Sequence, residues 1–151
     1  MSLAWTYHAT AHKARVAWYL LKACAALIKR AIRHDLSKYG PEEAPAYSRA
    51  LPSLQDADYA SDQYAAAIHL LGPALQHHYA NNTHHPEHWP NITQMSPLDL
   101  IEMLCDWKAA ADGHKASNFT HSLQLNQTRF HYDTPTADVL TSAAKEIRLC
   151  P

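Results

Sequence analysis

Apolar and small residues recur with helical spacing along the first part of the chain. Their positions, close to the 3.6-residue period of an α-helix, are Val16, Leu20, Ala23, Leu27 and Ala31. The pattern predicts a helix over residues 4–33. A stretch of this length can also bend or break into two helices before His34.

A proline- and glycine-rich break follows this first helix. Residues 40–43 read GPEE, which places a proline and two carboxylates where the first turn of a new helix accepts them. The pattern beyond predicts a short helix to about Leu51, a loop over residues 52–58, and a helix over residues 60–79 that Gly72-Pro73 kinks or splits.

Polar residues separate the remaining predicted helices. Residues 80–95 are expected to form a loop, and Ser96-Pro97 then gives a helix start with serine as the N-cap. That helix should run to about Asp112. Residues 113–133 are polar and read as a loop with a short helix, and a last helix is expected over about 135–149.

The composition agrees with this helical reading. Of the 151 residues, 47% are hydrophobic and only three are glycine, while alanine is abundant. The length suits one domain that buries roughly 70% of its unfolded surface. We therefore predict an all-α fold, a compact single-domain bundle of about five to seven helices over residues 1–151.

Charge and cysteine usage restrict the function classes. The formal net charge is −1 with no evident basic stripe, so we expect no long nucleic-acid partner. Cys24, Cys105 and Cys150 show no metal-binding spacing, and we interpret Cys24 and Cys105 as small buried residues of a reducing compartment. We see no signal-peptide pattern and no apolar run long enough to span a membrane, which predicts a cytoplasmic protein.

Histidine is the unusual residue, with twelve copies against two phenylalanines. His34 and Asp35 form an adjacent pair whose nitrogen and oxygen can bind one ion at about 2 Å. Lys38 follows on the same side, where it could meet an anionic group beside the metal. The alternative is an exposed His-Asp dipeptide of no function.

Histidines also lie on the first predicted helix. His8 and His12 are one turn apart, and such a pair can grip one ion. His12 alone could also face the site, with His8 peripheral. The alternative is a polar start to an amphipathic helix.

The densest histidine cluster falls at a helix end and in the loop after it. Five histidines occur within twelve residues: His77, His78, His84, His85 and His88. His77 and His78 lie on regular structure and can be aimed as ligands. The three others could form a wall, bind substrate or hold a second ion.

A stripe of carboxylates follows on the helix that begins at Ser96. Asp99, Glu102 and Asp106 share one face of a helix that is otherwise largely apolar. We expect Asp106 to be buried, and a buried carboxylate must be paired or bound to metal. A salt bridge to a basic residue is the alternative for Asp106, and Asp99 is best explained as a helix-start carboxylate.

The order of these elements resembles the HD superfamily of metal-dependent phosphohydrolases. The match consists of His12, His34-Asp35 and Asp106 for the basic metal site, and HDLSK at 34–38 resembles the HDxGK signature with serine in place of glycine. His77-His78 is similar to the double histidine of the two-metal branch, although the Gly-Tyr-Pro that follows there is absent. The phrase HHYxxNxHHPEHW, with DLIEMLCDW after it, also resembles short phage and bacterial proteins of unknown function. The likeness covers about residues 10–112.

The resemblance implies hydrolysis of a nucleotide or another small phosphate ester or anhydride by a metal-activated water, with Asp35 and Lys38 as catalytic residues. One or two ions of Zn, Mn, Fe, Co or Ni would be held by His12, His34, Asp35 and Asp106, with His77 or His78. Substrate contacts are expected from His84, His85, His88, Lys108 and Arg15, and more weakly from Lys115 and Arg129. Two alternatives stay open, an HD-type di-iron oxygenase or lyase and a non-enzymatic module with a structural metal. No membrane partner is expected, and a homo-oligomer is compatible with the apolar helix faces.

Overall fold

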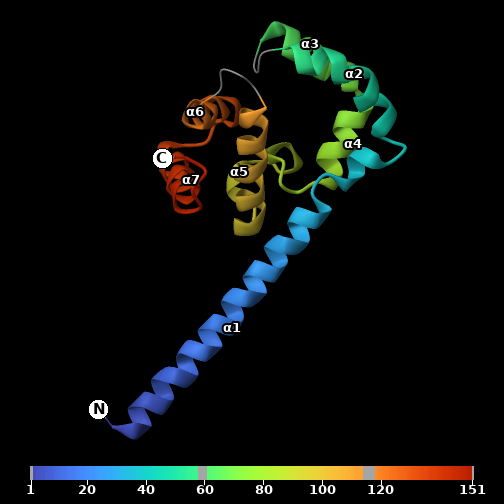
Figure 1. Ribbon diagram of the computed structural model, residues 1–151. Coiled ribbons are helices and arrows are strands. Elements are labelled where there is room, and N and C mark those ends of the chain that lie inside the picture. The colour runs from blue at the N-terminus through green and yellow to red at the C-terminus, as the bar shows by residue number, and fades with distance from the viewer. Residues whose placement is uncertain (1, 58–60, 114–117, 151) are drawn as a thin grey trace. The chain divides into compact units, whose positions relative to one another are not determined.

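The computed structural model describes residues 2–57, 61–113 and 118–150 (Figure 1). These residues form seven α-helices and three 3-10 helices and contain no strand, which confirms the predicted all-α class. The chain divides into two compact units, Met1–His34 and Asp35–Pro151, which are described separately below. The single domain over residues 1–151 stays a prediction. None of the described helices is both long and apolar enough to cross a membrane.

The first unit consists of one helix, α1 (Leu3–Arg33), as the apolar spacing predicts. The Ser2 side chain caps it by accepting from the backbone of Trp5 at 3.3 Å. A single helix has no second element in its own unit to bury its side chains, and none of its residues is buried. Cys24 is therefore exposed, and the expectation that it is a buried residue is wrong.

The two units carry opposite charge, which the overall value of −1 conceals. Residues 1–34 contain six of the thirteen lysines and arginines and none of the fourteen acidic residues. Four of the six are spaced along one side of α1 at Arg15, Lys22, Lys29 and Arg33. The first unit is thus cationic and the second is anionic.

The second unit begins with a 3-10 helix and three α-helices: η1 (Leu36–Tyr39), α2 (Ala44–Asp56), α3 (Asp62–Leu71) and α4 (Pro73–Asn81). Gly72 separates α3 from α4 with a φ of 49°, a value that side chains rarely adopt, so the predicted split is confirmed. The predicted loop over 52–58 is wrong, because α2 continues through Pro52 to Asp56. Its last turn brings Leu54 onto a small core made by Ala46, Ala50, Leu71 and Ala74.

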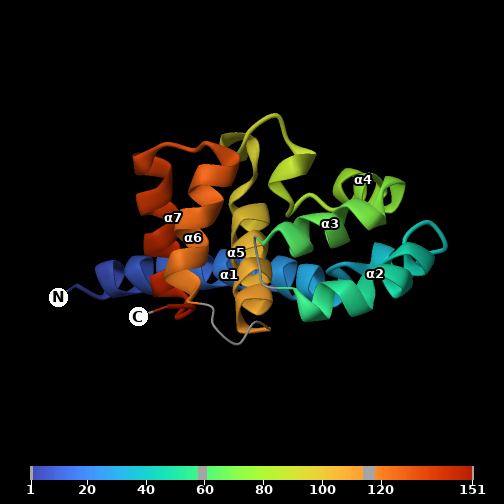
Figure 2. The same cartoon turned by 90° about the horizontal axis from the view of Figure 1, so that it is seen from above.

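The rest of the second unit contains η2 (Pro86–His88), η3 (Ile92–Gln94), α5 (Pro97–Asp112), α6 (Phe119–Phe130) and α7 (Thr134–Glu146). Helices α5, α6 and α7 lie side by side (Figure 2). They enclose the larger core, with Met103, Leu104 and Leu123 among its buried residues.

The polar stretch before residue 133 contains the helix that was expected there, α6, whose twelve residues bring the apolar side chains of Phe119 and Leu123 into the larger core. One expectation for this part of the chain needs correction. Cys105 is exposed, since the apolar face of α5 points its neighbours Met103 and Leu104 into the core instead. The helix start at Ser96 is confirmed, and Asp99 completes a reciprocal capping box with it.

Candidate metal centre

Four side chains of the second unit bring potential ligand atoms together. Asp35, His78, His84 and His85 each offer one nitrogen or oxygen, and these atoms all lie within 4.8 Å of one another. Three of the residues are buried, and His85 is half-buried. They come from the start of η1, the end of α4 and the loop between α4 and η2, so residues fifty positions apart meet at one point.

The distances within the group suit the coordination of a transition-metal ion. Oδ1 of Asp35 lies 3.3 Å from Nε2 of His78 and 3.4 Å from Nε2 of His84. For metal–ligand bonds of about 2.0–2.1 Å, the ligand atoms of a tetrahedral site are about 3.3 Å apart, and neighbouring ligands of an octahedral site about 2.9 Å. Nε2 of His78 and Nε2 of His85 are 2.8 Å apart, close to the second value.

Asp35 occupies an unusual backbone conformation. Its φ of 55° and ψ of 20° are left-handed, which among side chains aspartate and asparagine tolerate best. From this position the two oxygens of its carboxylate contact different partners. Oδ2 accepts a charge-assisted hydrogen bond from Lys38 Nζ at 2.6 Å, while Oδ1 faces the histidines. The sequence expectation that Lys38 lies beside the site agrees with this placement.

Glu43 orients His78 from behind. It is fully buried, and its Oε2 lies 2.8 Å from Nδ1 of His78. A carboxylate only accepts, so Nδ1 of His78 carries the hydrogen and Nε2 presents its lone pair toward Asp35. A histidine held by a carboxylate on one nitrogen, with the other nitrogen free for an ion, is a common arrangement in metal sites.

The other oxygen of Glu43 binds a second histidine. Oε1 lies 2.7 Å from Nδ1 of His77, whose side chain is 37% exposed. Burial alone would raise the pKa of Glu43, but hydrogen bonds from His77, Ser37 and His78 outweigh it and lower that pKa. Asn82 supports this arrangement by donating to the Ser37 hydroxyl at 2.8 Å and to the His78 carbonyl at 2.7 Å.

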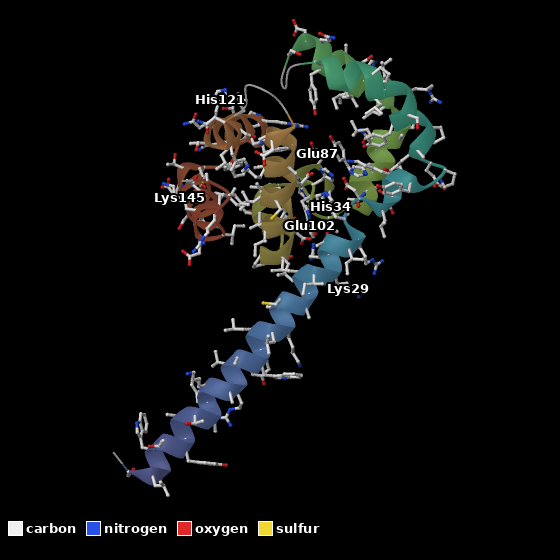
Figure 3. The ribbon with its side chains drawn as sticks, in the orientation of Figure 1. Lys29, His34, Glu87, Glu102, His121 and Lys145 are labelled. Carbon is white, nitrogen blue, oxygen red and sulfur yellow. The ribbon has the colours of Figure 1, made fainter. Side chains whose placement is uncertain are left out.

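His84 has a similar arrangement with a different carboxylate. Its Nδ1 lies 3.4 Å from Oε1 of Glu102, which projects from α5 (Figure 3), and its Nε2 faces Asp35. Two imidazoles therefore approach Asp35 from two sides, and each has a carboxylate at its far nitrogen.

Burial lowers the pKa of two of the three imidazoles in the group, which favours the neutral form that binds metal. Burial and then the neighbouring His84 lower the pKa of His85 to about 3. Burial also lowers the pKa of His78, although the nearby Asp35 carboxylate acts in the opposite direction. Neutral imidazoles at physiological pH need lose no proton before they accept a cation.

The loop that carries His84 and His85 is tied to helices on both sides. His88 donates from Nδ1 to the carbonyl of Tyr79 at 2.9 Å, which fixes the loop to α4. Thr83 donates to Oδ1 of Asp99 at 2.6 Å, which fixes it to α5. The Trp89 indole closes the loop by donating to the Thr83 carbonyl at 2.8 Å. These contacts explain how loop histidines can be aimed as accurately as helical ones.

The structure brings some of the predicted site residues together and separates others. The four-residue group contains Asp35 and His78, which were predicted as ligands, and His84 and His85, for which substrate contact or a second ion was expected. Asp106 is half-buried, not buried as expected, because it projects from the edge of the α5 face that enters the core. It still offers an oxygen within 4.8 Å of one from Asp35. His77 binds Glu43 and stands outside the four-residue group.

Other predicted residues have different places. Lys108 forms an ion pair with Asp112 one turn along α5, and Arg129 pairs with Glu87 at 2.6 Å. His88 holds the loop backbone, as described above. Lys115 lies outside the described residues. His12, Arg15 and His34 belong to the first unit, so their part in the site stays a prediction.

Glu43 and Glu102 are partners of the histidines that the sequence did not predict. Glu43 was interpreted only as a first-turn carboxylate, and the carboxylate stripe on α5 pointed to Asp106 more than to Glu102. The GPEE segment held the one available signal, because it contains two carboxylates where one would satisfy the helix start.

These features define the class of the protein: it is all-helical, with a His/Asp/Glu group that could hold a metal ion. A family model matches residues 1–148, and its description is Family of unknown function (DUF5662). The chain belongs to this family. Neither a curated protein nor a solved structure matches it.

Proposed function

We propose that this protein is a metal-dependent phosphohydrolase whose ion is held by Asp35, His78, His84 and His85. The observation that carries the proposal is the convergence of three imidazole nitrogens and Oδ1 of Asp35 on one point. Carboxylates behind His78 and His84 add the second layer that metal sites require. The nucleotide or other small phosphate substrate comes from the resemblance to the HD superfamily.

The donor set favours a transition metal. Three imidazoles and one carboxylate suit Zn, Mn, Fe, Co or Ni better than Ca or Mg, which prefer all-oxygen sites. When bound, such an ion lowers the pKa of a coordinated water and polarises a phosphoryl oxygen. The chain's own part is to hold the ligands in place with Glu43 and Glu102.

The positive charge of Lys38 beside the group favours an anionic substrate. Its Nζ contacts the outer oxygen of Asp35, and 37% of its side chain is exposed, so it lies at the border between the group and solvent. A phosphate oxygen bound beside the ion would share this ammonium group with Asp35. Lys38 would then stabilise the negative charge that develops on the phosphoryl oxygens.

A structural metal is the second candidate, favoured by the number of protein ligands. Four protein ligands are enough to close a tetrahedral site, and the two distances from Asp35 are of tetrahedral length. The 2.8 Å separation of Nε2 of His78 and Nε2 of His85 is that of a hydrogen bond between the two imidazoles, so this pair does not have the tetrahedral spacing that a closed site needs. A closed site predicts loss of fold on metal removal and no hydrolysis.

The test compares the wild type with Asp35→Asn, which keeps the left-handed backbone but removes the charge. Elemental mass spectrometry after incubation with Zn, Mn, Co or Fe should find about one ion or more per wild-type chain and none in the variant. Phosphate release from nucleoside mono- and triphosphates should follow the metal content. Metal binding without phosphate release from any substrate would support the structural site, and no metal in any sample would refute both.

A further inference from the structure

Glu43 occupies a position that is costly for a carboxylate. Its side chain is completely buried, and the groups that compensate its charge are the imidazoles of His77 and His78 and the hydroxyl of Ser37. An unpaired buried charge is strongly destabilising, and two neutral imidazoles compensate it less well than an arginine would. A stable fold alone would be served better by an apolar side chain of the same size, which suggests another role for Glu43.

We infer that Glu43 is a positioning residue that holds His77 and His78 with its two oxygens and so aims Nε2 of His78 at the metal. This inference rests on the proposed function, since it assumes an ion between His78 and Asp35. It also assigns His77, a predicted ligand, a different task. His77 holds Oε1 of Glu43 at 2.7 Å, and this contact fixes the direction of Oε2 toward His78.

The chemistry of the two oxygens explains why glutamate is needed. Each oxygen accepts a hydrogen from an Nδ1 atom, so both imidazoles are held in the same tautomer. Glutamine has the same shape but offers one acceptor and one donor. In Glu43→Gln, one of the two histidines must turn its lone pair toward the amide and move its hydrogen to Nε2. If this histidine is His78, its metal-facing nitrogen is blocked.

The first experiment measures Co²⁺ binding to the full chain by chelator competition and by the visible absorption of the bound ion. Glu43→Gln should weaken the affinity about 10–100-fold and shift the absorption bands, as other changes behind metal ligands do. Glu42→Gln is the matched control, because Glu42 is the exposed neighbour with the same chemistry and should bind as the wild type does.

A second pair of variants separates a holding role of His77 from a ligand role. Asparagine places an N–H close to where His77 carries Nδ1, so His77→Asn keeps the donor to Glu43 and loses Nε2. His77→Ala loses both. If His77 holds Glu43, the asparagine variant should retain the wild-type affinity while the alanine variant binds several-fold more weakly. Both changes fall on a partly exposed side chain, so both His77 variants should fold. They remain informative even if circular dichroism shows that Glu43→Gln is unfolded.

The outcomes distinguish this inference from the proposed function. Equal Co²⁺ affinity and equal spectra for the wild type, Glu43→Gln and Glu43→Leu, which removes both acceptor oxygens, would overturn the inference and leave the metal site standing. Equal losses in His77→Asn and His77→Ala would also overturn it and would make His77 a ligand. No Co²⁺ uptake by the wild type would overturn the proposed function itself, and the inference with it.

Discussion

His78 and His84 are presented to Asp35 by two regions of the second unit that hold them through different contacts. On the α4 side, Glu43 is fully buried and contacts His78 at 2.8 Å, with His77, Ser37 and Asn82 around it. On the α5 side, 13% of the Glu102 side chain is exposed, and it lies 3.4 Å from His84. The first contact is a charge-assisted hydrogen bond of ordinary length, and the second is longer than the usual N–H···O distance.

The difference indicates what sets the orientation of each histidine. The orientation of His78 is set by a side-chain network that excludes water. The orientation of His84 is set mainly by its loop, which Thr83 and His88 tie to the neighbouring helices. The centre therefore has one ligand oriented by a buried carboxylate and one oriented by a loop that is tied to two helices.

Removing a metal ligand should weaken metal binding to a similar extent on the α4 side and on the α5 side. This is the largest effect we expect. Both His78→Ala and His84→Ala should lower the affinity for Co²⁺ or Zn²⁺ by roughly 100-fold or more, because each removes a side chain that binds the ion directly. Chelator competition on the two purified variants measures this. If His84→Ala binds as tightly as the wild type, His84 is not a ligand and the centre is smaller than proposed.

Replacing the carboxylates of Glu43 and Glu102 should show how strongly each one supports its histidine. Glu102→Gln should weaken metal binding by no more than about 5-fold, against the 10–100-fold loss expected on the α4 side, since the loop already positions His84. The same competition assay measures both variants in parallel. A loss for Glu102→Gln as large as that for Glu43→Gln would show that both sides are held equally tightly.

The smallest effect on metal binding is expected at the start of α5. Ser96→Ala removes the side-chain acceptor for the backbone of Asp99 and should lower the free energy of unfolding by about 1 kcal/mol. Metal affinity should change little, because Asp99 loses the hydrogen bond from the Ser96 hydroxyl but still accepts from Thr83 with its other oxygen, which keeps the loop attached to α5. Urea denaturation followed by circular dichroism gives the stability, and a reduced metal affinity in this variant would mean that the helix start also positions the site.

The sequence predicts the helices of this protein better than the contacts between their side chains. Periodicity, the Gly72 break and the Ser96 start are local signals, and the structure contains a helix or break at each. The continuation of α2 beyond Pro52 and the bounds of α6 depend on burial in the two cores, which no local pattern reports.

The candidate site is predictable in part for the same reason. Asp35 and His78 stand out as residue types in a helical context, so the sequence points to them. His77 and His78 are neighbours that point about 100° apart, and only the three-dimensional structure decides which one faces Asp35. Glu43 meets His78 across 35 positions of the chain. His84 and His85 lie in a loop, where no periodicity shows the direction of a side chain.

The opposite charges of the two units affect how the molecule behaves in solution. An isoelectric point near 6.9 suggests a nearly neutral surface, but the neutrality arises from a cationic segment and an anionic segment that cancel only in the sum. Attraction between unlike segments of neighbouring molecules is strongest in dilute buffer and fades once the screening length falls to about 8 Å near physiological ionic strength. We therefore expect salt concentration to change the association of this chain with copies of itself.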